Sequence, residues 1–253
     1  MNAAVSAVGT RITIASYNVH GCVGGDGRRD LARVARVLSG VDAHVIALQA
    51  IDCGPSGDDA EPTAVSVELL ASLSGYRAIW APTRCAEGGF FGNAILSSLT
   101  VQRSRTIDLS YRGYEPRSAL EVDFEVGGTL LRVIATHLGL FPSERRYQVR
   151  TLLAAAAEDE NAVTVLLGDI NEWFLPGRPL RWLHARFGYT PAVRTFPARF
   201  PLLSLDRIWA HPSRCLENVR AQRDGEARIA SDHLPVVGVI DLAAAARETA
   251  PAP

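Results

Sequence analysis

The chain has 253 residues, of which 47% are apolar, enough to bury one substantial core without splitting into two domains. Its 26 basic and 27 acidic residues leave a formal net charge of -1, so no global positive field attracts long polyanions. Every basic residue besides histidine is arginine, which excludes lysine Schiff-base chemistry and leaves guanidinium groups as the cations that can recognise phosphate.

The termini and the cysteines carry no targeting or metal signal. Residues 1–10 lack a basic region followed by a long apolar segment, and no run of about eighteen apolar residues occurs. We expect a cytoplasmic monomer without a transmembrane segment, folded as a single domain over 1–253 with flexible tails at 1–10 and 244–253. The cysteines are widely separated and form no Cys-x-x-Cys pair, which argues against a zinc knuckle or a redox motif.

Hydrophobic patterning predicts more strands than helices. The Gly127-Gly128 pair predicts a tight hairpin, and the run at 163–170 is apolar throughout, so we expect a strand buried on both faces. The order favours two packed sheets flanked by helices. The predicted strands are 11–20, 44–50, 76–81, 93–98, 99–108, 119–126, 129–138, 163–170, 205–210 and 234–242. The predicted helices are 30–38, 63–74, 143–158, starting from a Ser143 N-cap, and 178–187.

Two local patterns admit more than one interpretation. The strand, glycine-rich loop, helix and strand over 11–50 are also typical of a dinucleotide fold, but the loop at 21–27 does not fit G-x-G-x-x-G. Polar side chains stand at or just beyond five strand ends, where each needs a partner. Any one of them could simply cap a turn or a helix. They are Asn18 and His20; His137; Asp169 and Asn171; Asp206; and Asp232 and His233.

Taken together, these strand ends fall in segments that resemble one superfamily. The segments SYNVHG, THLG, GDIN, LDRI and SDHLP occur in the order and with the intervals of the deoxyribonuclease I-like, or endonuclease/exonuclease/phosphatase, superfamily. The resemblance covers about residues 11–240, and GDIN with SDHLP is its most specific part. This superfamily includes nucleases, sphingomyelinases and inositol-polyphosphate phosphatases. The resemblance implies an α/β (α+β) fold, a four-layer sandwich of two packed mixed, mainly antiparallel β-sheets flanked by α-helices.

The resemblance also implies a metal-dependent phosphoester hydrolase, acting on diesters rather than monoesters through in-line attack of an activated water. Asp169 would bind or activate that water, and Asn171 would hold the water or the phosphate. His233 would contact the scissile phosphate, oriented by the carboxylate of Asp206. His137 would lie on the side of the leaving group.

Phosphate and metal ligands follow from the same resemblance. Asn18 would support both the phosphate and the metal, and Asp232 and Asp169 would be metal ligands. The implied cofactor is Mg²⁺, with Mn²⁺ as a substitute, because a hard cation held by carboxylate oxygens can act as a Lewis acid. Arg117 resembles a phosphate clamp. Its alternative is an ion pair with Glu115 or Glu121.

One position departs from the expected pattern. The second strand of this superfamily ends in Gln-Glu, whose Glu is the main metal carboxylate, whereas this chain has Gln49-Ala50. Such a carboxylate is worth about 4 kcal/mol at an effective dielectric near 20, so metal affinity could fall about a hundredfold. In a continuing strand Asp52 would share the face of Ala50, although loop capping is its simpler role.

Three explanations of Ala50 stand open: an engineered Glu→Ala substitution, a natural variant of weak activity, and a non-catalytic pseudoenzyme that binds phosphorylated ligands. The otherwise intact set favours the first.

Substrate choice depends on loops that contain aromatic residues. Stretches at 88–92, 111–117, 173–174 and 195–203 are candidates for a substrate groove that stacks bases or touches lipid. We favour inward packing for most of these aromatic residues. The expected substrate is a phospholipid headgroup, a small phosphodiester or a single-stranded nucleic acid, with duplex DNA disfavoured by the net charge.

Overall fold

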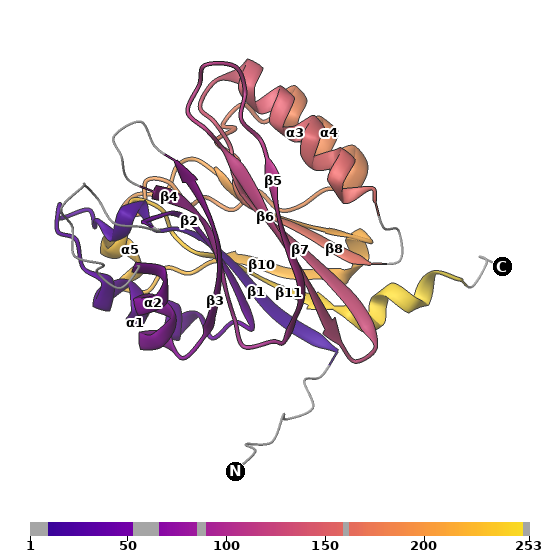
Figure 1. Cartoon of the computed structure of the whole chain (residues 1–253), viewed down its shortest axis with the longest axis horizontal. Coiled ribbons are helices and arrows are strands. Elements are labelled where there is room, and N and C mark those ends of the chain that lie inside the picture. The colour runs from indigo at the N-terminus through magenta and orange to yellow at the C-terminus, as the bar shows by residue number, and fades with distance from the viewer. Residues whose placement is uncertain (1–9, 53–65, 85–89, 159–161, 250–253) are drawn as a thin grey trace, which may run out of the picture.

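The structure, a computed structural model, describes residues 10–52, 66–84, 90–158 and 162–249 (Figure 1). Within them the strands form one six-stranded and one five-stranded sheet. In spatial order the six-stranded sheet contains β10 (Leu216–Ala221), β11 (Val236–Asp241), β1 (Arg11–Asn18), β2 (Val45–Asp52), β4 (Phe90–Ser97) and β3 (Arg77–Arg84). The five-stranded sheet contains β5 (Val101–Asp108), β6 (Ser118–Val126), β7 (Thr129–His137), β8 (Val163–Asp169) and β9 (Asp206–His211).

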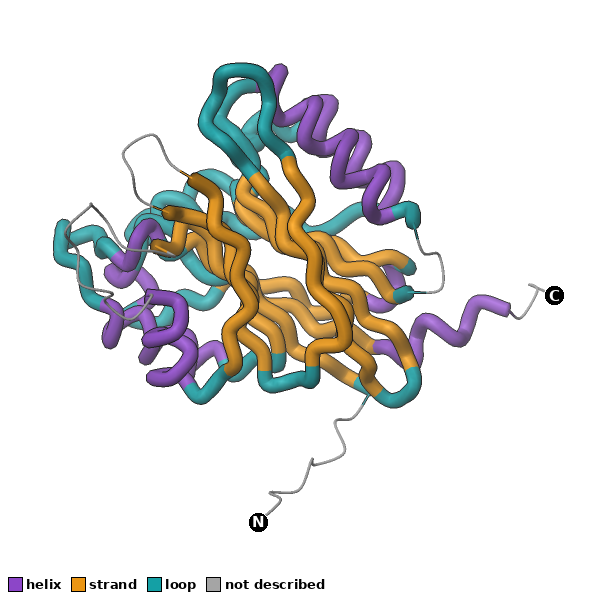
Figure 2. Tube along the Cα trace, viewed as in Figure 1, coloured by secondary structure: helices purple, strands orange, loops and turns teal. Residues whose placement is uncertain are grey.

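Helices cover the two outer faces of this pair of sheets (Figure 2). The helices that pack against the six-stranded sheet are α1 (Leu31–Val41), α2 (Ser66–Ser74) and α5 (Ala227–Ala230). Those that pack against the five-stranded sheet are α3 (Pro142–Ala156) and α4 (Arg178–Phe187). The short 3-10 helices are η1 (His20–Cys22), η2 (Ser213–Cys215) and η3 (Leu242–Thr249). The arrangement confirms the predicted four-layer sandwich of mixed sheets flanked by helices.

The alternation of side chains along each strand explains the layers. In β1, Ile12 and Ile14 join the core between the sheets, whereas Tyr17 joins the core beneath α1 and α2. In β8, Val165 points into the core between the sheets and Leu166 into the core beneath α3 and α4. Successive side chains of a strand point to opposite faces, so an apolar run is buried on both sides. All of β8 is buried, as its continuous apolar sequence predicted.

Two parallel pairs determine where polar strand ends can meet. β1 runs parallel to β2, and β7 runs parallel to β8, while the other neighbouring strands described in the two sheets are antiparallel. The carboxyl ends of parallel neighbours lie at the same edge of a sheet. Asn18 and His137, which end β1 and β7, are therefore next to the ends of β2 and β8.

Some local expectations differ from the structure. Helix α3 begins after Phe141 rather than from a Ser143 N-cap, because Pro142 suits the first helical position and Glu144 accepts a hydrogen bond from the Phe141 N–H at 3.4 Å. The expected C-terminal tail forms η3 up to Thr249, and Arg214 donates to the carbonyl of Ala244 at 2.8 Å. Residues 1–9 and 250–253 of the expected tails lie outside the described part of the chain.

Candidate active site

Strand register aligns three of the predicted residues. Asp169, the last residue of β8, pairs with His137 on β7 and with Asp206 on β9. Its carboxylate lies 3.5 Å from His137 Nε2 and 3.7 Å from His233 Nε2. Both histidines therefore face the same buried oxygen, Oδ2 of Asp169, although His233 comes from the loop that precedes β11.

Gly168 permits the close strand approach beside Asp169. Its φ is +147°, and an added Cβ would lie 1.9 Å from the carbonyl oxygen of Thr136. No other residue fits this position without displacing the backbone of β7. The glycine of the GDIN segment is therefore required by the structure, because it allows β8 to approach β7 closely immediately before Asp169.

Hydrogen bonds hold both oxygens of Asp169. The amide Nδ2 of Asn18 donates to Oδ2 at 3.0 Å, and the backbone N–H of Asn171 donates to Oδ1 at 2.9 Å. The side chain of Asn171 is directed elsewhere, because its Nδ2 donates to the carbonyl of Leu138 at 2.8 Å. Asn171 itself has a φ of +51°, a conformation that asparagine tolerates better than most residues. Asn18 thus joins the six-stranded sheet to the acid of the five-stranded sheet.

His233 and Asp206 form the second pair. Nδ1 of His233 lies 2.8 Å from Asp206 Oδ2, and the hydroxyl of Thr195 donates to the same oxygen at 2.5 Å. Burial by itself lowers the pKa of His233, but the charge and hydrogen bond of Asp206, with Asp169 adding to them, raise it to about 9. His233 is therefore an imidazolium at neutral pH, with Nε2 directed at Asp169. The ring of Phe196 packs against it, with centroids 4.9 Å apart.

His137 has the opposite electrostatic character. Desolvation outweighs the attraction of Asp169 and lowers the pKa of His137 to about 4, so this imidazole is neutral at pH 7. The positive charge of Arg117 contributes to the lowering, which places that guanidinium near the site. Nη2 of Arg117 donates to Glu115 at 2.6 Å, which is the ion pair foreseen as the alternative to phosphate binding. Among the residues that the structure describes, its buried Nε has no hydrogen-bond partner.

Asp232 lies on a more open side of the site. Its side chain is 38% exposed and its Oδ1 lies 3.8 Å from Nδ1 of His20. Ser231 connects this loop to β1. Its hydroxyl donates to the carbonyl of Asn18 at 2.7 Å and lies 3.3 Å from Asp232 Oδ1. Asn18 Oδ1 accepts from the backbone N–H of His20 at 3.1 Å.

This arrangement of strands and polar groups has a counterpart in a described protein family. Residues 15–233 match the model of the endonuclease/exonuclease/phosphatase family.

The chain belongs to this family.

Three known proteins illustrate the likeness. An uncharacterized protein of Escherichia coli, YbhP, is 33% identical over 165 residues, which cover 61% of this chain and only 64% of that protein. An endonuclease/exonuclease/phosphatase from Beutenbergia cavernae is 23% identical with a TM-score of 0.72, over 92% of this chain and 72% of that one. An endonuclease/exonuclease/phosphatase from Bacteroides vulgatus is 14% identical with a TM-score of 0.74, over 92% of this chain and 99% of that one.

Ala50, the position where the resemblance implied a metal-binding glutamate, lies at a β-bulge. The pairing of β2 with β4 shifts between Leu48 and Ile51, and Ala50 has a φ of +51°. A bulge of this kind re-aims side chains and breaks the alternation of the strand. The expectation that Asp52 shares the face of residue 50 assumed a regular strand, and the bulge removes that assumption. The side chain of Asp52 lies outside the described residues.

Three of the predicted site residues offer donor atoms that suit a hard divalent cation. Asn18, Asp169 and Asp232 offer amide and carboxylate oxygens, the ligand type that Mg²⁺ and Mn²⁺ accept. Asp232 Oδ2 makes no hydrogen bond in the described part of the chain, so a carboxylate oxygen is available there. The set therefore fits a metal ion, with one carboxylate fewer than the family pattern implies.

A second grouping of possible ligands surrounds His233. Ligand atoms of Asp169, Asp206 and His233 lie within 4.8 Å of one another. Asp206 Oδ2 is shared by His233 Nδ1 and the hydroxyl of Thr195, which together fix the orientation of the imidazole. Among the described residues, the buried Asp206 Oδ1 has no hydrogen-bond partner.

Sequence reasoning gave no role to several residues at the site. Thr195 and Phe196 fall in the stretch at 195–203, but nothing in that stretch revealed that it crosses over His233. His20 was noted as a strand-end residue without a function. Ser231 lies in the SDHLP segment, and its position next to Asp232 was the sequence signal that could have indicated a role at the site.

The candidate groove residues are divided between packed and exposed positions. Trp173 and Phe174 are 53% and 61% exposed, and Phe200 is 68% exposed, so inward packing was the wrong expectation for these three. Tyr111 stacks with Tyr114, with centroids 5.9 Å apart. Residues 88 and 89 and the side chains of 90 and 91 lie outside the described part. Among the described helices, none is long and apolar enough to cross a membrane.

Proposed function

We propose that the chain is a metal-dependent phosphoester hydrolase that cleaves phosphodiesters by in-line attack of water, with an activity weakened by Ala50. The observation that carries the proposal is the convergence of two differently charged histidines on one buried acid. His233 is held as a cation by Asp206, His137 is neutral, and both place Nε2 within 3.7 Å of Asp169 Oδ2. Such a spread of pKa values in one cluster is typical of acid and base catalysis.

Each group then has a distinct task. The carboxylate of Asp169, oriented by Asn18 and the N–H of Asn171, accepts a proton from the attacking water. His233 donates from Nε2 to a phosphate oxygen, and Asp206 with Thr195 fixes its orientation. His137, a neutral imidazole, would hydrogen-bond the leaving oxygen.

Metal binding is part of the same proposal. Mg²⁺, or Mn²⁺ in its place, would be held by Asn18, Asp169 and Asp232 and would supply positive charge to the phosphate oxygens. Without Glu at position 50, cation affinity is expected to fall by about a hundredfold. A dianionic monoester would be repelled by Asp169 and Asp232 more strongly than a monoanionic diester, which is why we propose diesters. Arg117 would join as a phosphate clamp by exchanging Glu115 for substrate.

Ala50 also supports a second candidate, a phosphate-binding module without turnover. Loss of the main metal carboxylate alone would leave the anion-binding groups of Asn18 and His233 in place. The two candidates differ in what restoring the carboxylate does. With the carboxylate restored, a hydrolase would regain its rate of phosphodiester hydrolysis, whereas a binding module would at most bind the metal ion more tightly.

The decisive measurement is hydrolysis of bis(p-nitrophenyl) phosphate with Mg²⁺, Mn²⁺ or EDTA. We expect Ala50→Glu to lower the metal concentration for half-maximal rate by about a hundredfold. Ala50→Gln, which has a similar shape without the charge, controls for side-chain size. Adding Asp169→Asn to Ala50→Glu should abolish the gain. Binding of phosphate without hydrolysis by any of these proteins would favour the binding module.

A further inference from the structure

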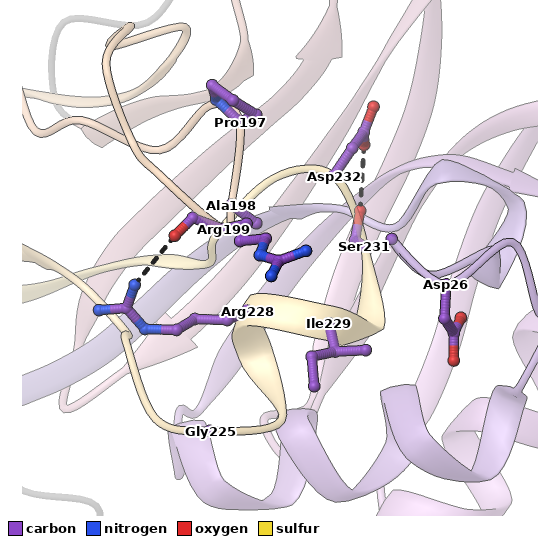
Figure 3. A pocket seen from close by; sticks show the side chains of 10 residues that line it. Asp26, Pro197, Ala198, Arg199, Gly225, Arg228, Ile229, Ser231 and Asp232 are labelled. Atoms are coloured by element: carbon purple, nitrogen blue, oxygen red, sulfur yellow. Dashed lines mark hydrogen bonds between the residues drawn. The ribbon is translucent and has the colours of Figure 1, made fainter.

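A cavity of about 600 Å³ opens beside the catalytic groups (Figure 3). Its walls come from the loop at Gly25 and Asp26, the segment 197–199, helix α5 with the preceding Gly225, and the loop at Ser231. Asp232, proposed above as a metal ligand, is one of its lining residues. A molecule whose phosphate lies at the metal would therefore extend into this cavity. None of the catalytic roles proposed above uses its other walls.

Arg199 is the cation available in this cavity. Its side chain lies between Ala198 and Ile229 in Figure 3, on the side of Ser231 and Asp232. Its guanidinium lies 5.6 Å from the ring centroid of Phe200. Within the described part of the chain, it has no carboxylate partner. Its hydrogen-bond donors are thus free to meet an anion.

Arg228 has a different role in the same wall. Its Nε donates to the carbonyl of Arg223 and its Nη1 to the carbonyl of Arg199, each at 3.2 Å. Figure 3 shows it extending away from Ser231 and Asp232 to reach that carbonyl. Arg228 therefore fixes the backbone of Arg199 and has fewer donors left for a ligand.

The charge balance of the cavity favours an anionic ligand. Asp26 is neutralised by Arg33, which donates to its two carboxylate oxygens at 2.7 and 3.0 Å. Asp232 faces the proposed metal. Among the described residues, Arg199 and Arg228 are lining cations without a carboxylate partner, and Pro197, Ala198 and Ile229 give the cavity apolar walls. A ligand with an apolar or sugar-like spacer between two anionic groups matches this combination of surfaces.

We propose that this cavity binds a second phosphate of the substrate, and that Arg199 is the specificity-determining residue that recognises it. The substrate class is then a phosphodiester that carries a further phosphate beyond a short spacer. The second phosphate can belong to a small bisphosphorylated molecule or to the neighbouring link of a single-stranded nucleic acid. This inference rests on the proposed function for its description of the substrate, but binding at Arg199 requires neither metal nor turnover.

The test compares two ligands that differ by one phosphate. Thymidine 5′-monophosphate and thymidine 3′,5′-bisphosphate are titrated calorimetrically into the full chain in EDTA. We expect the bisphosphate to bind about tenfold to hundredfold more tightly, the range of a charge-assisted arginine contact. Arg199→Ala should remove this ratio, and Arg199→Lys should retain part of it because lysine keeps the charge and loses the planar fork.

Arg150 provides the matched control. Its guanidinium lies 4.8 Å from the ring centroid of Trp182, so Arg150→Ala removes the same charge and the same kind of ring contact on another face. Arg150→Ala should leave the ratio unchanged. Equal affinities for the two ligands in the unaltered chain, or a ratio that survives Arg199→Ala, would overturn the proposal. A folded far-ultraviolet circular dichroism spectrum for each variant excludes loss of the fold as the cause.

Two further measurements identify the molecule that carries the second phosphate and test the proposed function independently of the cavity. Tetrathymidylate without terminal phosphates, if bound more tightly than the bisphosphate in an Arg199-dependent way, identifies nucleic acid as the source. The opposite preference identifies a small bisphosphate. An Arg199-dependent ratio in a protein whose Ala50→Glu form hydrolyses nothing would support the cavity and reject the hydrolase. Hydrolysis with no ratio would do the reverse.

Discussion

The candidate site has a closed half and an open half. They differ in how many of their polar groups already have partners within the protein. The closed half consists of Asp169, Asp206 and His233, whose exposed fractions are 1%, 1% and 5%, and both ring nitrogens of His233 face the carboxylates of the other two. The open half consists of Ala50 and Asp232, and the buried Asn18 connects the two halves through its hydrogen bond to Asp169. There the Asp232 side chain is 38% exposed and Ala50 offers no ligand.

The contrast indicates that the two halves serve different chemistry. Groups that move protons require fixed orientation, which burial and hydrogen bonds provide. Groups that hold a cation are completed by the cation itself. With alanine at position 50, the hydrogen bonds of the closed half are nevertheless in place, so each half can be altered separately.

The largest expected effect is that substitutions in the two halves change different kinetic parameters. In the Ala50→Glu background, Asp206→Asn should lower kcat on the order of a thousandfold, because His233 loses its charge partner and its orientation. Asp232→Asn should instead raise the Mg²⁺ concentration for half-maximal rate by about tenfold to hundredfold. Steady-state kinetics on an aryl phosphodiester over a range of Mg²⁺ measure both quantities. If both substitutions change the same parameter, the division into halves is wrong.

Gly168→Ala tests whether the closed half depends on the close approach of β8 to β7. The added methyl group would meet the Thr136 carbonyl at 1.9 Å, so we expect a loss of about 3 kcal/mol or more. For a chain of this size, that corresponds to a decrease in Tm of roughly 10 °C, measured by thermal denaturation. Gly40→Ala is the control, because a Cβ there meets nothing within 4 Å and α1 gains an alanine. A similar Tm for the two variants would contradict the strand-approach explanation.

The raised pKa of His233 predicts a pH-dependent stability of the closed half in EDTA. Its folded value of about 9 exceeds the ordinary 6.5, so the imidazolium stabilises the fold fully below pH 6.5 and this contribution disappears as the pH rises through 9. Urea unfolding should show the chain exceeding its Asp206→Asn variant by up to about 3 kcal/mol at low pH. The gap should narrow above pH 9. A gap independent of pH would mean that Asp206 stabilises the fold without charging His233.

Thr195→Val gives the smallest effect. The variant keeps the shape of Thr195 and removes its hydrogen bond to Asp206, measured at 2.5 Å. We expect kcat to fall about fivefold to tenfold, as for loss of one hydrogen bond to a charged group. Because Asp206 still holds His233, the metal dependence should not move. A change in metal dependence instead would place Thr195 in the open half.

Much of the fold could be predicted because central strands such as β6 and β8 are buried on both faces and therefore mainly apolar. Strand β10 was missed because it lies at the edge of the six-stranded sheet, where LENVRA is partly exposed and too polar to stand out. The start of α3 was misplaced because a serine two positions inside the helix resembled an N-cap. Short-range pattern identifies burial well and the ends of elements less well.

The site residues that end strands in recognisable motifs could be predicted. Those that reach the site from a distant loop could not. Asp169, Asp206 and His233 come together as the motifs implied. Thr195 reaches Asp206 from a loop eleven positions earlier in the chain, which no local pattern encodes. The bulge at Ala50 was also hidden, because an alanine with positive φ carries none of the glycine or asparagine signal that usually marks one.

The pairing of His137, Asp169 and Asp206 across adjacent strands has a consequence for how this protein can vary. Insertion or deletion of one residue within β8 would turn Asp169 to the opposite face of the sheet. Loops beyond these strand ends carry no such penalty. Sequence change that alters ligand preference should therefore accumulate in the loops, while strand lengths stay constant.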